Sequence, residues 1–145
     1  MVAKLTLKLK NDREELERIV TAVEEFAAQD EWPEDLLFKI NLVLEEIGLN
    51  IIDYAFESGS HEFEINLTSD AEAITIEAID SGRPFDPLSE TPLPDLDAPL
   101  DCRPVGGLGV YLVRTLMDQS DYQRVDGKNC LTVVKYRTET PTCPE

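Results

Sequence analysis

The chain has 145 residues, enough for one domain with a substantial core, and 42% of them are hydrophobic. Its 30 acidic and 13 basic side chains give a net charge of −17, which argues against direct nucleic-acid binding. No stretch is apolar for the length of a membrane span, and the N-terminus lacks the apolar block of a signal peptide. We therefore expect a cytoplasmic protein with no membrane contact.

The N-terminal half is expected to form one strand and two helices. Residues 2–10 alternate apolar side chains with lysines, a period of two that is typical of a half-buried strand. Residues 11–30 place apolar side chains three and four positions apart, as in an amphipathic helix that Asn11 or Asp12 can cap. Residues 32–56 carry a wider apolar stripe with a proline in the first turn, which predicts a second helix.

The C-terminal half is expected to add three strands, a long loop and a helix. Residues 61–69 and 71–80 alternate as strands and are predicted to form a hairpin over a tight turn. Residues 84–104 contain six prolines, which favour a loop over a helix. Residues 107–118 follow as a third helix. Residues 130–137 form the last strand, after a DGKN turn of hairpin type.

The order of these elements bears on the fold class. Strands and helices do not alternate singly, so a doubly wound parallel sheet is not expected. A mixed sheet with helices on one face suits the order better. The sequence therefore predicts an α+β fold, a two-layer α/β sandwich.

Two pairs of residues are candidates for chemistry. Glu46 and Asn50 lie one helical turn apart among apolar neighbours; the asparagine oxygen suits Mg²⁺ and the carboxylate can accept a proton. Asp80 ends an apolar strand, where its carboxylate can accept a hydrogen bond from an exocyclic amine, and Gly82 permits a close approach of the backbone to a flat ring. Taken alone, the first pair is better explained as a solvated helix edge, and the second as an ordinary turn leaving a strand.

A glycine cluster precedes the third helix. Free amide groups at a helix start hold phosphate well, and glycine permits close approach, so Gly106, Gly107 and Gly109 form a candidate phosphate loop. The cluster lacks the Lys-Ser/Thr pair of a P-loop, and the strand-turn-helix context of a dinucleotide fingerprint is missing.

The order of these motifs is more specific than any one of them. EEIGLNIIDYAF, AIDSGRPFDP, GGLGVYLVRTLMD and GKNCLTVVKY follow one another along the chain. Together they resemble the ATP-binding domain of the histidine kinase-like (GHKL, or Bergerat) ATPase superfamily, to which gyrase and the histidine kinases belong. Within it, the chain is most similar to the serine/threonine-protein kinases that act as anti-sigma factors. The resemblance extends from the first strand to about Arg137.

The resemblance implies roles for individual residues. Glu46 matches the residue that acts as general base or polarises the attacking group. Asn50 matches the Mg²⁺ ligand, Asp80 the carboxylate that recognises adenine, and Gly82 its neighbouring glycine. A lid over ATP is implied for residues 87–105. The resemblance also implies Gly106, Gly107 and Gly109 at the phosphates and Thr132 near adenine. The positive charge of Arg103 and its place in the lid suggest a further phosphate contact.

The resemblance also implies a function. Residues 1–138 would form the ATP-binding domain and residues 139–145 a C-terminal tail. The protein would use Mg²⁺ and ATP to phosphorylate a serine or threonine of an anti-anti-sigma (antagonist) protein, and would otherwise sequester a sigma factor. A homodimer is implied as well. Two alternatives stay open: an ATP-dependent binding module without kinase activity, and a sensor-kinase catalytic domain. The acidity serves either solubility or docking to a basic partner.

Overall fold

The structure is a computed structural model that describes residues 2–56, 59–84 and 113–137. Its elements in chain order are β1 (Ala3–Lys10), α1 (Glu15–Gln29), α2 (Glu34–Asn50), a π-helical turn η1 (Ile51–Ala55), β2 (Glu62–Ser69), β3 (Ala73–Asp80), β4 (Gln119–Val125) and β5 (Lys128–Tyr136). None of the helices within these ranges has the length and apolar character needed to cross a membrane.

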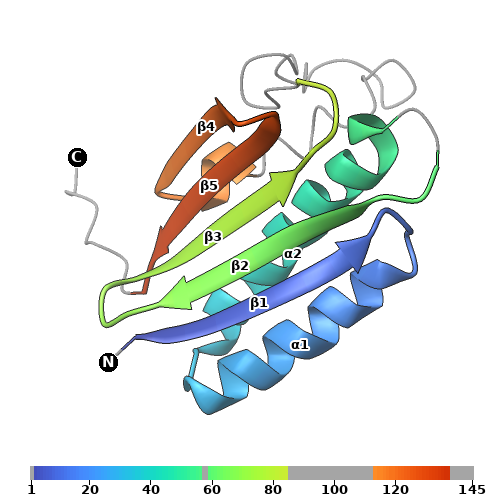
Figure 1. The fold of residues 1–145 in the computed structure, drawn as a ribbon. Coiled ribbons are helices and arrows are strands. Elements are labelled where there is room, and N and C mark those ends of the chain that lie inside the picture. The colour runs from blue at the N-terminus through green and yellow to red at the C-terminus, as the bar shows by residue number, and fades with distance from the viewer. Residues whose placement is uncertain (1, 57–58, 85–112, 138–145) are drawn as a thin grey trace, which may run out of the picture.

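The strands form one five-stranded sheet in the order β1-β2-β3-β5-β4. Figure 1 shows α1 and α2 covering one face of this sheet, so the predicted two-layer α+β fold is confirmed. The expectation of a mixed sheet was wrong, because all four pairings among the described strands are antiparallel. Tight turns reverse the chain between β2 and β3 and between β4 and β5. Two helices, an even number, separate β1 from β2, and so β2 runs back along β1.

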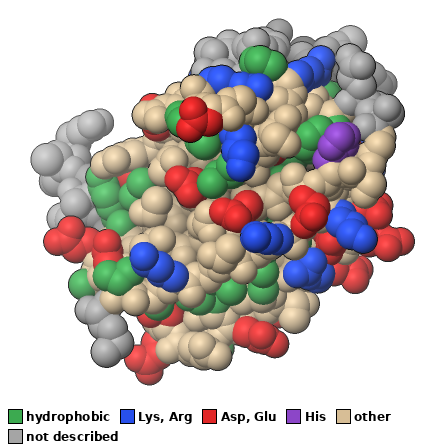
Figure 2. Space-filling model, viewed as in Figure 1, with side chains coloured by type: hydrophobic (Ala, Val, Ile, Leu, Met, Phe, Trp, Pro, Cys, Tyr) green, Lys and Arg blue, Asp and Glu red, His purple; other side chains and the backbone are tan. Residues whose placement is uncertain are grey.

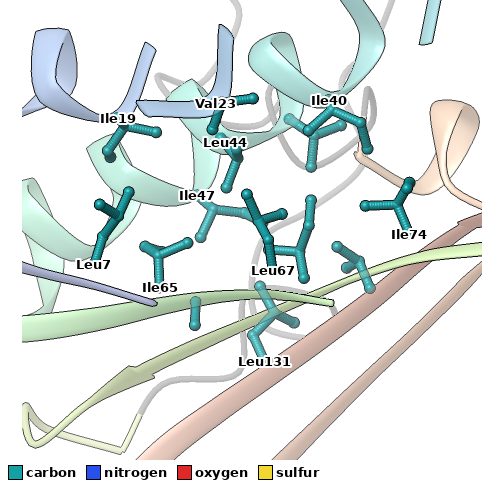
Figure 3. Close-up of a cluster of buried hydrophobic side chains, with 14 of the residues drawn as sticks. Leu7, Ile19, Val23, Ile40, Leu44, Ile47, Ile65, Leu67, Ile74 and Leu131 are labelled. Carbon is teal, nitrogen blue, oxygen red and sulfur yellow. The ribbon is translucent and has the colours of Figure 1, made fainter. Parts of the chain in front are cut away.

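The core lies between the helices and the inner face of the sheet. Along β2 and β3, every second side chain is buried, as the alternation in the sequence predicts. Figure 3 shows Leu7, Ile65 and Leu67 of the sheet pointing toward Ile19 and Leu44 of the helices. Each fully buried side chain of this kind contributes about 1.5–3 kcal/mol, so this layer supplies the main drive for folding.

The outer face of the sheet is polar. In the register of β1 and β2, Lys8 lies opposite Glu64 and Lys10 lies opposite Glu62. Figure 2 shows Lys and Arg side chains next to Asp and Glu side chains over this face. The strands therefore alternate because the sheet is covered on one side only.

The start of α1 differs from the prediction. The N-cap residue is Glu14, which makes no capping hydrogen bond through its side chain. Asn11, predicted as a cap, instead donates to the carbonyl of Gly59 at 3.0 Å and accepts from the backbone N–H of His61 at 2.9 Å. Its side chain thus ties the end of β1 to the segment that leads into β2.

The last hairpin contains a strand that the sequence did not suggest. β4 is polar and mostly exposed, so it lacks the alternation that marks a half-buried strand. It is held by pairing with β5 across a two-residue turn, in which Asp126 and Gly127 have φ of 51° and 78°. Positive φ at both positions identifies a type I′ turn, as the DGKN sequence predicts. Of the predicted third helix, the described part is the turn at 113–116.

Candidate functional site

A pocket opens at the end of the sheet where β3 stops and β5 begins, under the last turns of α2. Its lining residues are Ile47, Asn50, Ile51, Ala55, Ala78, Asp80, Tyr122, Asn129 and Leu131. Most of the wall is apolar, with a few polar groups that converge on it. This composition is typical of a site that binds a small organic molecule.

Asp80 is the most distinctive polar group in the pocket. It is the last residue of β3 and faces the helices, and only 7% of it is exposed. Its Oδ1 accepts hydrogen bonds from the backbone N–H of Gly82 and from Nδ2 of Asn129, each at 2.9 Å. Within the described part of the chain, Oδ2 receives no hydrogen bond and the carboxylate has no cationic partner. The second oxygen is therefore available to a donor in the pocket.

Gly82 has a steric reason to be glycine. A Cβ atom at this position would lie 2.3 Å from the carbonyl oxygen of Ala55, closer than any side chain can approach. The next residue, Arg83, donates its backbone N–H to that same oxygen at 3.0 Å and its Nε–H to the carbonyl of Tyr54 at 2.9 Å. The turn after β3 thus donates hydrogen bonds to the carbonyl oxygens at the end of η1, which have no partner within the helix. A π-helical turn such as η1 is frequent at functional sites.

The far end of α2 supplies the second polar wall. Asn50 lines the pocket, and Glu46 lies one turn earlier and is half-buried. Burial raises the pKa of the Glu46 carboxyl, and the negative charge of neighbouring Glu45 raises it further. A carboxylate with a raised pKa is a stronger base than an ordinary glutamate, which suits proton transfer near neutral pH.

The donor set fits Mg²⁺ that arrives with a phosphate-bearing ligand. Among the residues that the structure describes, no three His, Cys, Asp or Glu side chains form a cluster that could hold a metal by themselves. Mg²⁺ seldom needs such a cage, because it commonly binds one or two protein oxygens together with substrate phosphates and water. Asn50 offers one hard, neutral oxygen at the pocket wall.

The structure brings four of the predicted site residues to one region. Asn50 and Asp80 line the pocket, Gly82 follows in the turn beyond Asp80, and Glu46 lies on the neighbouring turn of α2. The predicted lid, residues 87–105, lies outside the described ranges. So do the predicted phosphate contacts Arg103, Gly106, Gly107 and Gly109.

Thr132 does not join this group. It lies between Leu131 and Val133, which are buried toward the helices, so it faces the opposite side of the sheet. Its cross-strand neighbours there are Glu77 and Asp121. Alternation along β5 therefore separates Thr132 from the pocket, and we leave it out of the site.

Two polar residues of the pocket were not predicted from the sequence. Asn129 directly follows the DGK sequence, a position that predicts a turn residue. In the structure it belongs to β5, and its side chain lies on the inner face of the sheet, as that of Leu131 does. Tyr122 lies in the polar strand that was not predicted. Only the strand register, which places Asn129 opposite Asp80 and Tyr122 opposite Leu131, reveals both as pocket residues.

Comparison with known proteins agrees with the geometry. The family model of the histidine kinase-like ATPase domain matches residues 9–135. The serine/threonine-protein kinase BtrW of Bordetella bronchiseptica is 34% identical over 116 residues, which cover 79% of this chain and 80% of that protein. With the α+β fold and the Asn50–Asp80 pocket, these matches show that the chain belongs to the histidine kinase-like ATPase family.

Proposed function

We propose that the protein is a Mg²⁺- and ATP-dependent serine/threonine-protein kinase that acts as an anti-sigma factor. The observation that carries the proposal is the single pocket that brings Asn50 of α2 and Asp80 of β3 together. Membership of the ATPase family and the similarity to a serine/threonine-protein kinase support the assignment.

The base of ATP would lie against the end of β3. Oδ2 of Asp80 would accept the hydrogen bond that the 6-amino group of adenine donates. The apolar wall, including Ile51 and Ala78, would exclude water from the flat ring. In this arrangement a buried carboxylate recognises a donor, while the ring gains affinity by burying its apolar surface.

The phosphates would extend along α2. Asn50 would hold Mg²⁺, which would neutralise part of the negative charge on the phosphate oxygens. Glu46 would accept the proton of the attacking hydroxyl. Gly106, Gly107 and Gly109 would contact the phosphates, as their sequence motif indicates. Arg103 would do so because of its positive charge and its place in the lid.

The phosphoryl acceptor would be a serine or threonine of an anti-anti-sigma (antagonist) protein, and the sequestered partner a sigma factor. The net charge of −17 supports a basic partner protein and opposes direct binding to nucleic acid. Action in the cytoplasm, and assembly as a homodimer, belong to the same proposal.

Two measurements on the unmodified protein test this function. Calorimetry should detect Mg-ATP and ADP at micromolar Kd, about −8 kcal/mol. Incubation with γ-labelled ATP and the antagonist protein encoded nearest to its gene should transfer label to a serine or threonine. Nucleotide binding without transfer would support the binding module in place of the kinase. Absence of nucleotide binding would refute both.

A further inference from the structure

Asn129 is the most completely hydrogen-bonded side chain at the pocket. It is 5% exposed. Its Nδ2 donates to Oδ1 of Asp80 at 2.9 Å and to the carbonyl of Arg83 at 2.8 Å. Its Oδ1 accepts from the hydroxyl of Tyr122 and from Nη1 of Arg124, the latter at 3.1 Å. Both amide hydrogens and both lone pairs of the carbonyl oxygen are therefore used.

The partners leave the amide group only one orientation. The carbonyl of Arg83 can only accept a hydrogen bond, and the guanidinium of Arg124 can only donate one. Nδ2 must therefore face Arg83 and Asp80, and Oδ1 must face Arg124. A flipped amide would set two acceptors against each other on one side and two donors on the other.

The strand register explains why one residue reaches so many partners. Asn129 lies opposite Asp80 on β3 and opposite Arg124 on β4, in one row across the inner face of the sheet. Arg124 also donates to the carbonyl of Gly82 at 2.8 Å. The row thus joins β3, the turn after it and the β4–β5 hairpin at one wall of the pocket.

We propose that Asn129 is a positioning residue that sets the nucleotide specificity of the pocket through Asp80. By occupying Oδ1, it leaves Oδ2 as the acceptor that meets the base. An acceptor in that place favours a purine with an amino group at position 6, as in adenine. It disfavours guanine, which presents a carbonyl oxygen there. The inference rests on the proposed binding of an adenine nucleotide.

The alternative is that Asn129 only holds the hairpin against β3. Loss of a purely structural clamp would weaken all nucleotides alike. Loss of a positioning residue would reduce the preference for the 6-amino group. The ratio of affinities for two bases therefore separates the two roles.

The experiment measures Kd by calorimetry for ADP, for GDP, and for purine riboside 5′-diphosphate, which lacks the exocyclic amine. The wild type should bind ADP at least about tenfold more tightly than either of the others. Asn129→Ala should weaken ADP binding about tenfold and bring the affinities for ADP and purine riboside 5′-diphosphate close to a ratio of one.

Asn66→Ala is the matched control. Asn66 also makes three side-chain hydrogen bonds within the sheet, with Thr6, Glu64 and Glu77. These bonds lie on the outer face, so this variant should lose stability and keep the wild-type affinity ratios. If Asn129→Ala does not fold, Tyr122→Phe removes one bond to Oδ1 while the ring remains. It should reduce the ratio in the same direction by a smaller factor.

The outcomes are distinct. A wild type that binds none of the three nucleotides would refute the proposed function and this inference with it. A wild type that prefers ADP, with a folded Asn129→Ala or Tyr122→Phe variant that keeps the full preference, would overturn the inference alone. An equal loss of affinity for all three nucleotides would also overturn it and assign Asn129 a structural role.

Discussion

Two acids, the half-buried Asp30 and the buried Asp80, lie at opposite ends of the sheet and have different hydrogen-bond partners. At the end where β2 stops, Oδ2 of Asp30 accepts from Nε1 of Trp32 at 2.8 Å, from Oγ of Ser69 at 2.5 Å and from Nη1 of Arg137 at 2.6 Å. Arg137 also donates to the backbone carbonyl of Asp30. This network joins the α1–α2 connection to the ends of β2 and β5. At the other end lies Asp80.

Asp80 differs from Asp30 in its partners. Its two hydrogen bonds come from neutral amide groups and end on one oxygen, and its side chain lines a pocket. A carboxylate paired with a guanidinium has its charge compensated and its acceptor sites occupied, so it serves the fold. A carboxylate that is bonded only to neutral donors on one oxygen has its other oxygen left to accept a hydrogen bond from a ligand. The charge of the partners is therefore the difference that bears on ligand binding.

The largest expected effect concerns a third acid, the half-buried Glu46 of α2. Glu46→Gln should lower phosphoryl transfer by roughly 10²–10⁴-fold, because the amide cannot accept a proton, while Mg-ATP still binds. Asn50→Ala should instead weaken Mg-ATP binding by loss of a metal ligand. Label transfer and calorimetry on the same preparations separate the two. Wild-type turnover in Glu46→Gln would remove Glu46 from the mechanism.

The pH dependence provides a control for Glu46. The base must be ionised, so transfer should fall as pH falls through its raised pKa. Glu45→Gln removes the neighbouring charge that helps raise this pKa. That variant should keep the maximal rate and shift the fall to lower pH. An unshifted profile would show that the group titrating is not Glu46.

Replacing each of the two aspartates by asparagine, in separate variants, tests the comparison directly. Asp80→Asn should weaken ADP roughly ten- to hundredfold, because a charged acceptor for the base amine is lost. Asp30→Asn should leave the Kd unchanged, since no contact of Asp30 reaches the pocket lining. Calorimetry on both variants is sufficient. Equal weakening by both would mean that the two networks do not have separate roles.

The stability of the same variants should show the opposite pattern. Asp30→Asn should lower the free energy of unfolding by about 1–3 kcal/mol, because charge-assisted hydrogen bonds from Arg137 and others are weakened. Thermal and urea unfolding measure this loss. Asp80→Asn should change stability less, because it removes no ion pair formed within the described residues.

The pH dependence of that stability has a defined sign. Burial raises the pKa of the Asp30 carboxyl, but hydrogen bonds from Ser69, Arg137 and Trp32 outweigh burial and hold the pKa below its ordinary value. An acid with a lowered pKa in the folded state stabilises the fold above its ordinary pKa and loses that contribution as pH falls through the lowered value. The difference in stability between wild type and Asp30→Asn should therefore shrink below about pH 4. A gap that grows in acid would contradict this reading.

The smallest effect is expected at the surface of α1. Glu15 accepts hydrogen bonds from the backbone of Lys10 and from Arg18, so it is committed within the chain. Reversing the exposed charges at Glu17, Glu24 and Glu25 should slow association with a basic partner several-fold at low salt and less at physiological salt. Three reversals elsewhere, at Glu62, Glu72 and Asp121, control for net charge. An on-rate insensitive to salt and to the α1 reversals would leave the acidity as a matter of solubility.

The periodic spacing of apolar residues predicted most of the helices and strands. It failed for the element that has little buried surface. The two helices, β1, β2, β3 and β5 all carry a buried stripe that repeats at the period of the element. β4 has little buried surface and exists because a type I′ turn pairs it with β5. The antiparallel direction of every pairing, and the π-helical end of α2, likewise depend on contacts between elements.

The candidate site divides in the same way. Glu46, Asn50, Asp80 and Gly82 were found because each lies in a motif whose order along the chain is specific. Asn129 and Tyr122 belong to no such motif and enter the pocket through strand register. Thr132 was placed near adenine on its motif position, and alternation along β5 puts it on the other face.

The sequence by itself determined the class of fold, the family and the residues of the ordered motifs, because these depend on local period and on spacing along the chain. The tertiary structure alone decided which partners each of the two aspartates has. The sequence does not show which side chains Asp30 and Asp80 contact: Arg137 lies beside Asp30, and the amide of Asn129 lies beside Asp80. Arg137 is 107 residues from Asp30 and Asn129 is 49 residues from Asp80. Only packing of the sheet brings such distant residues within hydrogen-bond distance.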